Sequence, residues 1–310
     1  MPINFLQMGC GCNIFFEDIG GGILCGGEAD ESSSRIEVGG TILCGGTAYV
    51  DVAGDVWDGM EFVYHLQEQG IGTDEEYIDS SPNELHGTGG SGVADYCPTR
   101  EDGIFCLYAQ TFDATNDFIS IPQDTLQDQD FALSFWGKLD SFYAQNTILG
   151  RGTKDNLGNT VFSVGHSVMR HIHAQFNLND DGTADEIFDA FSATTLDQSK
   201  WYHIAVSFDH IAKRVDVYLN GTLDNTNDST STAALATLKN DGVIGKTNQT
   251  GFQSVFSAFG NSGFFEGSLM EIRFHPEKRN EAWWAAEYNN WCSGNFVLIG
   301  EEETSTLPIT

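Results

Sequence analysis

The stretch that most constrains this chain runs from Trp201 to Gly221, where two alternating segments flank a short polar connection. Apolar residues occupy every second position of each segment, which is the period of a strand with one buried face. In order, these positions are Tyr202, Ile204, Val206 and Phe208, then Val215, Val217 and Leu219. The connection over residues 209–214 has hairpin length, and Asn220-Gly221 is a strong signal for a further tight turn. The pattern predicts an antiparallel hairpin inside a β protein.

Composition agrees with that fold class and restricts the partners. The 310 residues include 35 Gly and 22 Phe, a combination that favours strands and tight turns. The formal net charge of −31 argues against nucleic acid and anionic membranes as partners, because phosphate binding requires a basic surface. No apolar run reaches the roughly 18 residues of a transmembrane helix, and residues 1–16 lack the basic start of a signal peptide.

Cysteine is present in an odd number, and its seven positions are Cys10, Cys12, Cys25, Cys44, Cys97, Cys106 and Cys292. We expect free thiols that pack as small apolar groups, as in a protein made in a reducing compartment. A zinc site at Cys10 and Cys12 with Cys25 and Cys44 is disfavoured, because the C-x-C spacing is not that of a zinc knuckle and no paired histidines follow.

Residues 1–56 form a separate glycine-rich region with an internal repeat. Ile23-Leu-Cys25 recurs as Ile42-Leu-Cys44, and each copy stands between glycine pairs. Glycine pairs allow tight corners, while three-residue strands bury too little surface to be stable alone. We therefore predict a docking or oligomerising β-repeat that stacks on sister copies or on another protein, the alternative being a flexible leader.

Residues 57–303 carry a series of motifs in a fixed order, followed by a tail over residues 304–310. The motifs are Val63-Tyr-His-Leu66, Asp79-Ser-Ser-Pro-Asn83, Leu85-His-Gly-Thr88, residues 109–122, Phe131-Ala-Leu-Ser-Phe-Trp136, the 201–221 hairpin, Gly242-Val-Ile-Gly245 and residues 265–274. This order resembles the laminin-G-like, concanavalin A-like jelly rolls, the superfamily that includes pentraxins and legume lectins. The resemblance implies an all-β sandwich of two sheets, and it implies structural roles for His65 and His86, paired with loop backbone.

Further elements are predicted from the local pattern. Asn280 can cap one short C-terminal helix that continues to Trp291, with tryptophans at helical spacing that seat it on the sandwich. Strands are expected over residues 161–164 and 168–177, split at residues 165–167, and over residues 187–191. The Asn-, Asp-, Ser- and Thr-rich run over residues 224–232 is predicted to be a loop from its composition.

Calcium is the cofactor that the resemblance implies. Asp155 and Asn156 stand where pentraxins carry an aspartate–asparagine calcium pair, although the second loop of that site, residues 245–251 here, has no carboxylate. Asp113, Asn116 and Asp117 are an alternative ion site, but such residues more often cap a turn. The histidines His166, His171 and His173 suggest a transition metal, whereas the plainer interpretation is the wet face of a sheet.

Enzymatic function is not predicted. Glycoside hydrolases of this fold need two carboxylates across the sugar bond, and the nearest pattern, Glu271-Ile-Arg273, offers an arginine at the partner position. Serine-hydrolase, zinc-protease and phosphate-loop motifs do not occur.

The hypothesis favoured by these observations is a structural protein of a bacteriophage virion, in a tail, fibre or head-decoration position. It would be made in the host cytoplasm and dock to other virion proteins or to itself through residues 1–56, with the jelly roll facing host-surface glycans. The alternatives are a cellular glycan-binding or adhesion protein and, less favoured, a glycoside hydrolase.

Overall fold

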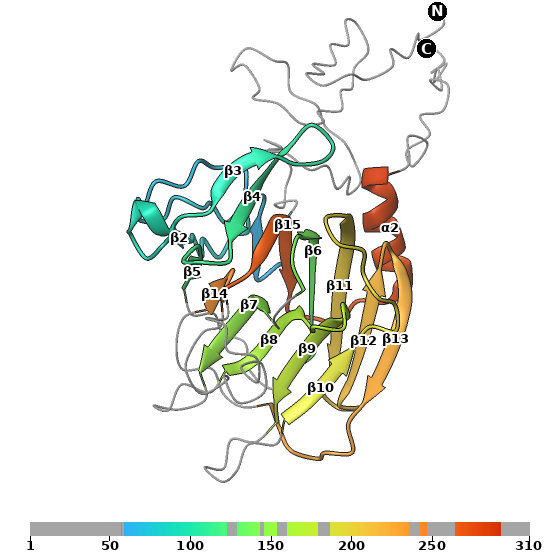
Figure 1. Ribbon diagram of the computed structural model, residues 1–310. Helices are drawn as coiled ribbons and strands as arrows, with labels where there is room; N and C mark the ends of the chain where they lie inside the picture. Colours follow the sequence, from blue (N-terminus) through green and yellow to red (C-terminus); the bar gives the residue numbers. More distant parts are fainter. Residues whose placement is uncertain are drawn as a thin grey trace, which may run out of the picture.

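The computed structural model describes residues 57, 59–122, 129–142, 146–153, 160–178, 187–235, 242–246 and 264–292. The predicted repeat over residues 1–56 and the tail over residues 304–310 lie outside these ranges. The described chain forms two antiparallel sheets that face each other, with one helix against the larger sheet (Figure 1). This is the predicted jelly-roll sandwich with a short C-terminal helix.

The larger sheet contains eight strands. Seven of them follow the order β13 (Thr222–Asp228), β12 (Arg214–Leu219), β11 (Trp201–Asp209), β6 (Phe131–Leu139), β15 (Glu266–His275), β4 (Tyr108–Asp113) and β3 (Thr99–Asp102). The eighth, β1 (Phe62–Tyr64), pairs with β15, so the first and last described strands of the chain are neighbours.

The smaller sheet contains seven strands. Their order is β10 (Ile187–Phe191), β9 (Ile172–Asn177), β8 (Thr160–His166), β7 (Asn146–Thr153), β14 (Gly242–Ile244), β5 (Ile119–Ile121) and β2 (Thr88–Gly89). A short 3-10 helix, η1 (Ala94–Tyr96), follows β2. Within the described chain, no helix is long and apolar enough to span a bilayer.

The predicted hairpin is strands β11 and β12, and its apolar positions line the core between the sheets. Val206 pairs with Val217 in the ladder, and both side chains are fully buried. Phe131 on the neighbouring strand stacks on Phe274 with ring centroids 5.2 Å apart and meets Phe162 of the other sheet edge-on at 4.9 Å. Aromatic contacts of this kind add to the burial of apolar area that holds the two sheets together.

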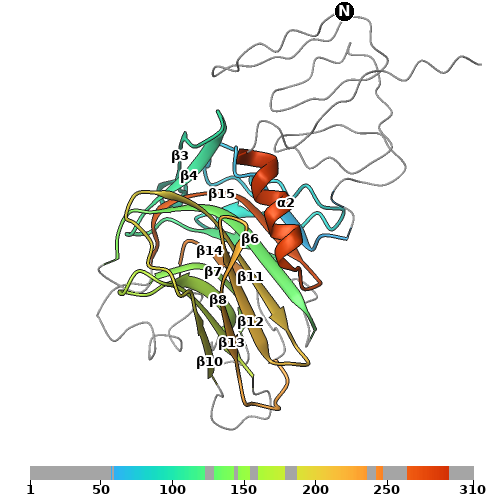
Figure 2. The ribbon, with the colours of Figure 1, turned by 90° about the vertical axis from the view of Figure 1, so that its right-hand side faces the viewer.

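The opposite side of the hairpin receives helix α2 (Glu281–Cys292), which lies on the outer face of the larger sheet, away from β7 and β8 (Figure 2). As predicted, the Asn280 side chain caps the helix by accepting a hydrogen bond from the Trp283 amide, at 3.1 Å. Trp284 is completely buried against Ala132, Ala205 and Tyr218. The prediction that tryptophans seat the helix is therefore confirmed.

Gly221, the second residue of the predicted turn, has φ +78 and lies under the helix. A Cβ at this position would come within 2.8 Å of the Tyr288 Cβ and 3.0 Å of the Trp284 carbonyl oxygen. The turn therefore needs glycine both for its backbone conformation and for the close approach of α2.

A buried ionic network joins α2 to the sheet. Glu287 accepts a hydrogen bond from Ser134 at 2.8 Å and lies 3.2 Å from His203 Nε2 and 3.4 Å from Arg273 Nη1. Burial alone would raise the pKa of Glu287, but the charge of Arg273 and the hydrogen bond from His203 hold that pKa well below its usual range. Removing one partner of such a buried pair typically costs about 3–5 kcal/mol, so these charges act in folding.

Two histidines of the first motifs have separate partners. His86 Nδ1 accepts a hydrogen bond from the Asp79 backbone amide at 3.0 Å, which confirms its predicted pairing with loop backbone. His65 is buried and structural, as predicted, but the predicted partner is wrong, because its Nδ1 lies 2.9 Å from the carboxylate of Glu271 rather than against loop backbone.

Two other predictions are corrected by the fold. The run over residues 224–232 is not all loop, because strand β13 continues to Asp228 and pairs with β12 from Arg214 to Leu219. The break between β8 and β9 falls after His166 rather than at residues 165–167. Its turn is closed by a hydrogen bond from the Ser167 amide to the His171 carbonyl at 2.9 Å, with Arg170 in the left-handed region at φ 66.

Three cysteines lie in the described chain, and none of the three forms a disulfide there. Cys97 is buried, and Cys106 and Cys292 are exposed.

Candidate functional site

The candidate site is the outer face of the seven-stranded sheet at β8, β9 and β10. Strand alternation directs Ile172, Ala174 and Phe176 into the core, so the residues between them point the other way. We call this surface the polar face, and it consists of Ser163, His173, Gln175, Asn177, Asp189 and Phe191. The ladder places Ser163 opposite Gln175 and Gln175 opposite Asp189, so these three side chains form one row across the strands.

Asp189 is the hydrogen-bond acceptor at the centre of the polar face. Its Oδ1 lies 2.7 Å from His173 Nε2 and accepts a hydrogen bond from Gln175 Nε2 at 2.6 Å. Burial alone would raise the pKa of Asp189, but the hydrogen bonds from His173 and Gln175 outweigh it and lower that pKa, which keeps the carboxylate ionised at neutral pH. The His173 ring in turn stacks on Phe191, with centroids 4.2 Å apart and planes 15° apart.

The floor of the polar face contains buried polar atoms that lack partners. Ser163 Oγ and Gln175 Oε1 have no hydrogen-bond partner among the described residues, although both residues are at most 1% exposed. An unsatisfied buried polar group costs about 1–3 kcal/mol, and few such groups persist in native proteins without a bound water, an ion or a functional role. At the rim, the Asp189 and Phe191 side chains are more than a third exposed.

The position of Phe191 is fixed from the other sheet. Asn225 Nδ2 donates to the Phe191 carbonyl at 2.8 Å, and Asn227 Oδ1 accepts from the Phe191 amide at 3.2 Å. Both asparagines lie on β13, the strand that composition predicts as a loop. These bonds join the edges of the two sheets and hold the aromatic ring at the rim of the polar face.

The calcium residues inferred from the pentraxin resemblance cannot be placed at this face, because Asp155 and Asn156 lie outside the described residues. The alternative ion site, Asp113 to Asp117, is a capped turn, as the sequence favours. Asp113 Oδ1 accepts hydrogen bonds from the Thr115 and Asn116 amides at 2.8 and 3.3 Å, and Asp117 accepts from the Asp113 amide at 3.1 Å. Burial, with the charge of Asp113, raises the pKa of Asp117 to about 6.

The three histidines do not converge. His166 points into the core and lies edge-on against Phe142 at 5.1 Å, and burial lowers its pKa to about 4. His173 is on the opposite side of the sheet, and it is only 1% exposed, so the prediction of a wet face is wrong for it. Nowhere in the described ranges do three or more His, Cys, Asp or Glu side chains gather as metal ligands.

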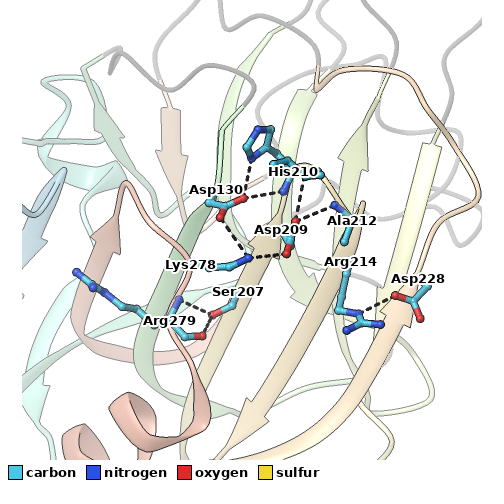
Figure 3. Close-up of polar contacts among 10 residues, drawn as sticks. Asp130, Ser207, Asp209, His210, Ala212, Arg214, Asp228, Lys278 and Arg279 are labelled. Atoms are coloured by element: carbon cyan, nitrogen blue, oxygen red, sulfur yellow. Dashed lines mark hydrogen bonds and ion pairs between the residues drawn. The ribbon is translucent and has the colours of Figure 1, made fainter.

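A second polar cluster lies at one end of the larger sheet and is structural (Figure 3). Lys278 Nζ lies 2.6 Å from Asp209 and 3.5 Å from Asp130, and His210 Nδ1 lies 2.7 Å from Asp130. Asp209 also accepts from the Ile211 and Ala212 amides. The cluster therefore ties the β11–β12 turn to the start of β6 and the segment before α2.

Sequence reasoning missed most of the polar face. Of its six residues, His173 alone stood out, and then as a possible metal ligand. Ser163, Gln175 and Asp189 are ordinary strand residues in the sequence, and their grouping depends on a register that alternation does not supply. The one usable signal is the run of polar side chains at alternate positions, His173, Gln175 and Asn177.

Comparison with known proteins agrees with this architecture. The family model for the concanavalin A-like lectin/glucanases superfamily matches residues 113–283, more than half of the chain. The chain belongs to this superfamily. No curated protein sequence matches it significantly.

Several solved structures share the fold at low sequence identity. The binding domain of Paraclostridial Mosquitocidal Protein 1 is 12% identical with a TM-score of 0.54, covering 76% of this chain and 53% of that one. Botulinum neurotoxin type C, whose cell entry is described as dependent on two ganglioside molecules, is 13% identical with a TM-score of 0.52, covering 77% and 53%. The serotype D ligand-binding domain, in complex with N-acetylneuraminic acid, is 11% identical with a TM-score of 0.51, covering 75% and 51%. This chain spans about half the length of these structures, and the likeness concerns the fold alone.

Proposed function

We propose that this chain is a non-enzymatic glycan-binding protein whose ligand occupies the polar face. The observation that carries the proposal is the rim of the polar face, where the Asp189 carboxylate and the Phe191 ring are each more than a third exposed. Sugar hydroxyls donate and accept hydrogen bonds, and the C–H face of a sugar ring packs on an aromatic side chain. A glycan at the rim would meet the carboxylate and the aromatic ring at once.

The carboxylates support binding rather than hydrolysis. Glycoside hydrolysis uses two carboxyl groups about 5 to 10 Å apart across the sugar bond. Within the seven strands of the smaller sheet, over the residues that the structure describes, Asp189 is the only residue with a carboxylate side chain. The carboxylates Glu271 and Glu287 are engaged with Arg273 under the helix, with side chains 2% and 4% exposed, where no substrate reaches them.

The test is binding of the full chain to an array of bacterial and animal glycans, followed by calorimetry on the hits. We expect Phe191→Ala to weaken affinity about three- to tenfold, which corresponds to the 0.5–1.5 kcal/mol of an aromatic contact. Ile211→Ala is the matched control, because Ile211 is 82% exposed at the β11–β12 turn. A chain that binds no glycan, or that releases reducing ends from one, would contradict the proposal.

The setting that the sequence favours is a bacteriophage virion, with residues 1–56 docking the chain to the particle or to sister subunits. The acidic charge and the glycine-cornered repeat support this placement. Intact particles whose electron density has no place for this chain would count against it.

Calcium at Asp155 and Asn156 stays a proposal. A carboxylate and an amide oxygen suit a hard cation, which takes six to eight oxygen ligands in all. We expect the glycan affinity to be lower in buffer with EDTA, which removes calcium, than in buffer with calcium. An unchanged affinity would exclude a role for the ion in binding.

A further inference from the structure

We propose that the polar face selects glycans that carry a protonated amino group. This inference rests on the glycan-binding role proposed above and names the ligand class of the same site. The residues that carry it are Asp189 and Phe191, which alternate on β10 and therefore point to the same side of the sheet.

Only one oxygen of the Asp189 carboxylate is engaged by the described residues around it. His173 and Gln175 both contact Oδ1, and the described residues place no hydrogen-bond donor on Oδ2. The side chain is 36% exposed, so the carboxylate is partly accessible from the rim. An ionised oxygen in this position prefers a cationic donor, because hydrogen bonds between charged groups are stronger than neutral ones.

The ring of Phe191 is held in place and remains partly exposed. Its stacking on His173 and the asparagine bonds to its backbone fix one side of the residue, while 37% of it remains exposed. Residues two apart on a strand are separated by about 6.6 Å, roughly the width of a hexose. A sugar ring that packs on Phe191 can therefore present an amino substituent to Asp189, and the aromatic face also attracts a cation.

The charge near the rim of the polar face is mainly negative. Strands β8, β9 and β10 contain no Lys or Arg, and His173 is already committed to Asp189. Asp224 lies beside the end of β10, where it accepts hydrogen bonds from the Ala193 and Thr194 amides. Arg170, in the turn before β9, packs its guanidinium on the Phe142 ring, 5.8 Å from the ring centroid. A negative field of this kind attracts cationic ligands and repels carboxylated sugars.

The experiment compares three trisaccharides by calorimetry on the full chain, at mildly acidic pH and low salt. The probes are the trimer of glucosamine, the trimer of N-acetylglucosamine and sialyllactose. We expect the glucosamine trimer to bind at least about fivefold more tightly than its acetylated counterpart, the effect of about 1 kcal/mol from one exposed ion pair. Sialyllactose should bind most weakly of the three.

Two variants assign the preference to the site. Asp189→Asn should bind the glucosamine and N-acetylglucosamine trimers equally. Glu277→Gln removes the same charge from a glutamate whose side chain is 73% exposed next to α2, and it should retain the wild-type ratio. For the wild type, a higher salt concentration should reduce the preference for the glucosamine trimer, because salt screens the ion pair. This measurement does not depend on the folding of a variant.

The outcomes separate the two proposals. Equal affinity of the wild type for the two trimers, or a preference that persists in Asp189→Asn, overturns the amino-sugar inference. If none of the three probes binds while other glycans on the array do, the inference fails alone. If no glycan binds at all, the proposed function fails with it.

Discussion

Two serines at the residue scale show how the polar face differs from the rest of the sandwich. Ser163 and Ser134 are both strand residues that are at most 1% exposed. Ser134 Oγ donates to Glu287 at 2.8 Å, whereas Ser163 Oγ has no partner in the part of the chain that the structure describes. A hydroxyl that is buried without a hydrogen bond lowers stability, and in native proteins such groups are found mainly where a water, an ion or a function accounts for them.

The same substitution at these two positions should have opposite effects on stability. Ser163→Ala should leave the free energy of unfolding unchanged or raise it by up to about 1 kcal/mol, because it removes an unsatisfied group. Ser134→Ala should lower it by about 1.5–3 kcal/mol, because a hydrogen bond to a charged carboxylate is lost. Urea denaturation measures both. If Ser163→Ala destabilises the protein as much as Ser134→Ala, Ser163 has a structural partner and the argument for the polar face weakens.

Sequence reasoning reaches a clear limit at this scale. Alternation assigns Val206 and Val217 to the core, because an apolar side chain at every second position of a strand indicates the buried face. It does not reveal that Ser163, Gln175 and Asp189 form a row, since that depends on the register between three strands, which the alternation within each strand does not fix. It also gives His173 a solvent-exposed role, whereas the structure pairs it with Asp189.

At the scale of elements, the chain is most predictable where local pattern and turn chemistry agree. The β11–β12 hairpin has alternation on both arms and Asn220-Gly221 at its end, and it forms as the pattern predicts. Helix α2 combines an asparagine cap with tryptophans at helical spacing. In both cases, several independent local signals point to the same structure.

Strand β13 could not be found in this way. Its sequence is Thr222-Leu-Asp-Asn-Thr-Asn-Asp228, which has the composition of a loop. Two sets of contacts make it a strand: its ladder with β12, and the bonds from Asn225 and Asn227 to Phe191. The asparagines hydrogen-bond to the backbone of the opposite sheet, so tertiary contacts override the local preference. This element also positions the aromatic residue of the candidate site.

At the scale of the whole molecule, the two ends of the described chain meet. Trp57 and Trp291 both lie against the Arg273 guanidinium, with ring centroids 5.0 and 5.8 Å away, and β1 pairs with β15. Arg273 is buried and also bonds Glu271 at 2.9 Å. Residues 1–56 and the segment after Cys292 are therefore attached to the sandwich at neighbouring points on the larger sheet, whereas the polar face belongs to the smaller sheet. The proposed glycan site therefore lies on a different sheet from Trp57, the residue to which residues 1–56 are joined.

That separation predicts what removal of residues 1–56 does. A fragment that begins at Trp57 keeps the ring against Arg273 and the whole described core, so it should retain the circular dichroism spectrum and the glycan affinity of the full chain. It should lose self-association, because the repeated Ile-Leu-Cys strands are too short to bury their surface except against another copy or another protein. Sedimentation or light scattering of both proteins gives the result: an oligomer for the full chain and a monomer for the fragment. A full chain that is monomeric, or a fragment that still assembles, would remove the oligomerising role from residues 1–56, while the polar face and its ligand would remain to be judged on the binding data.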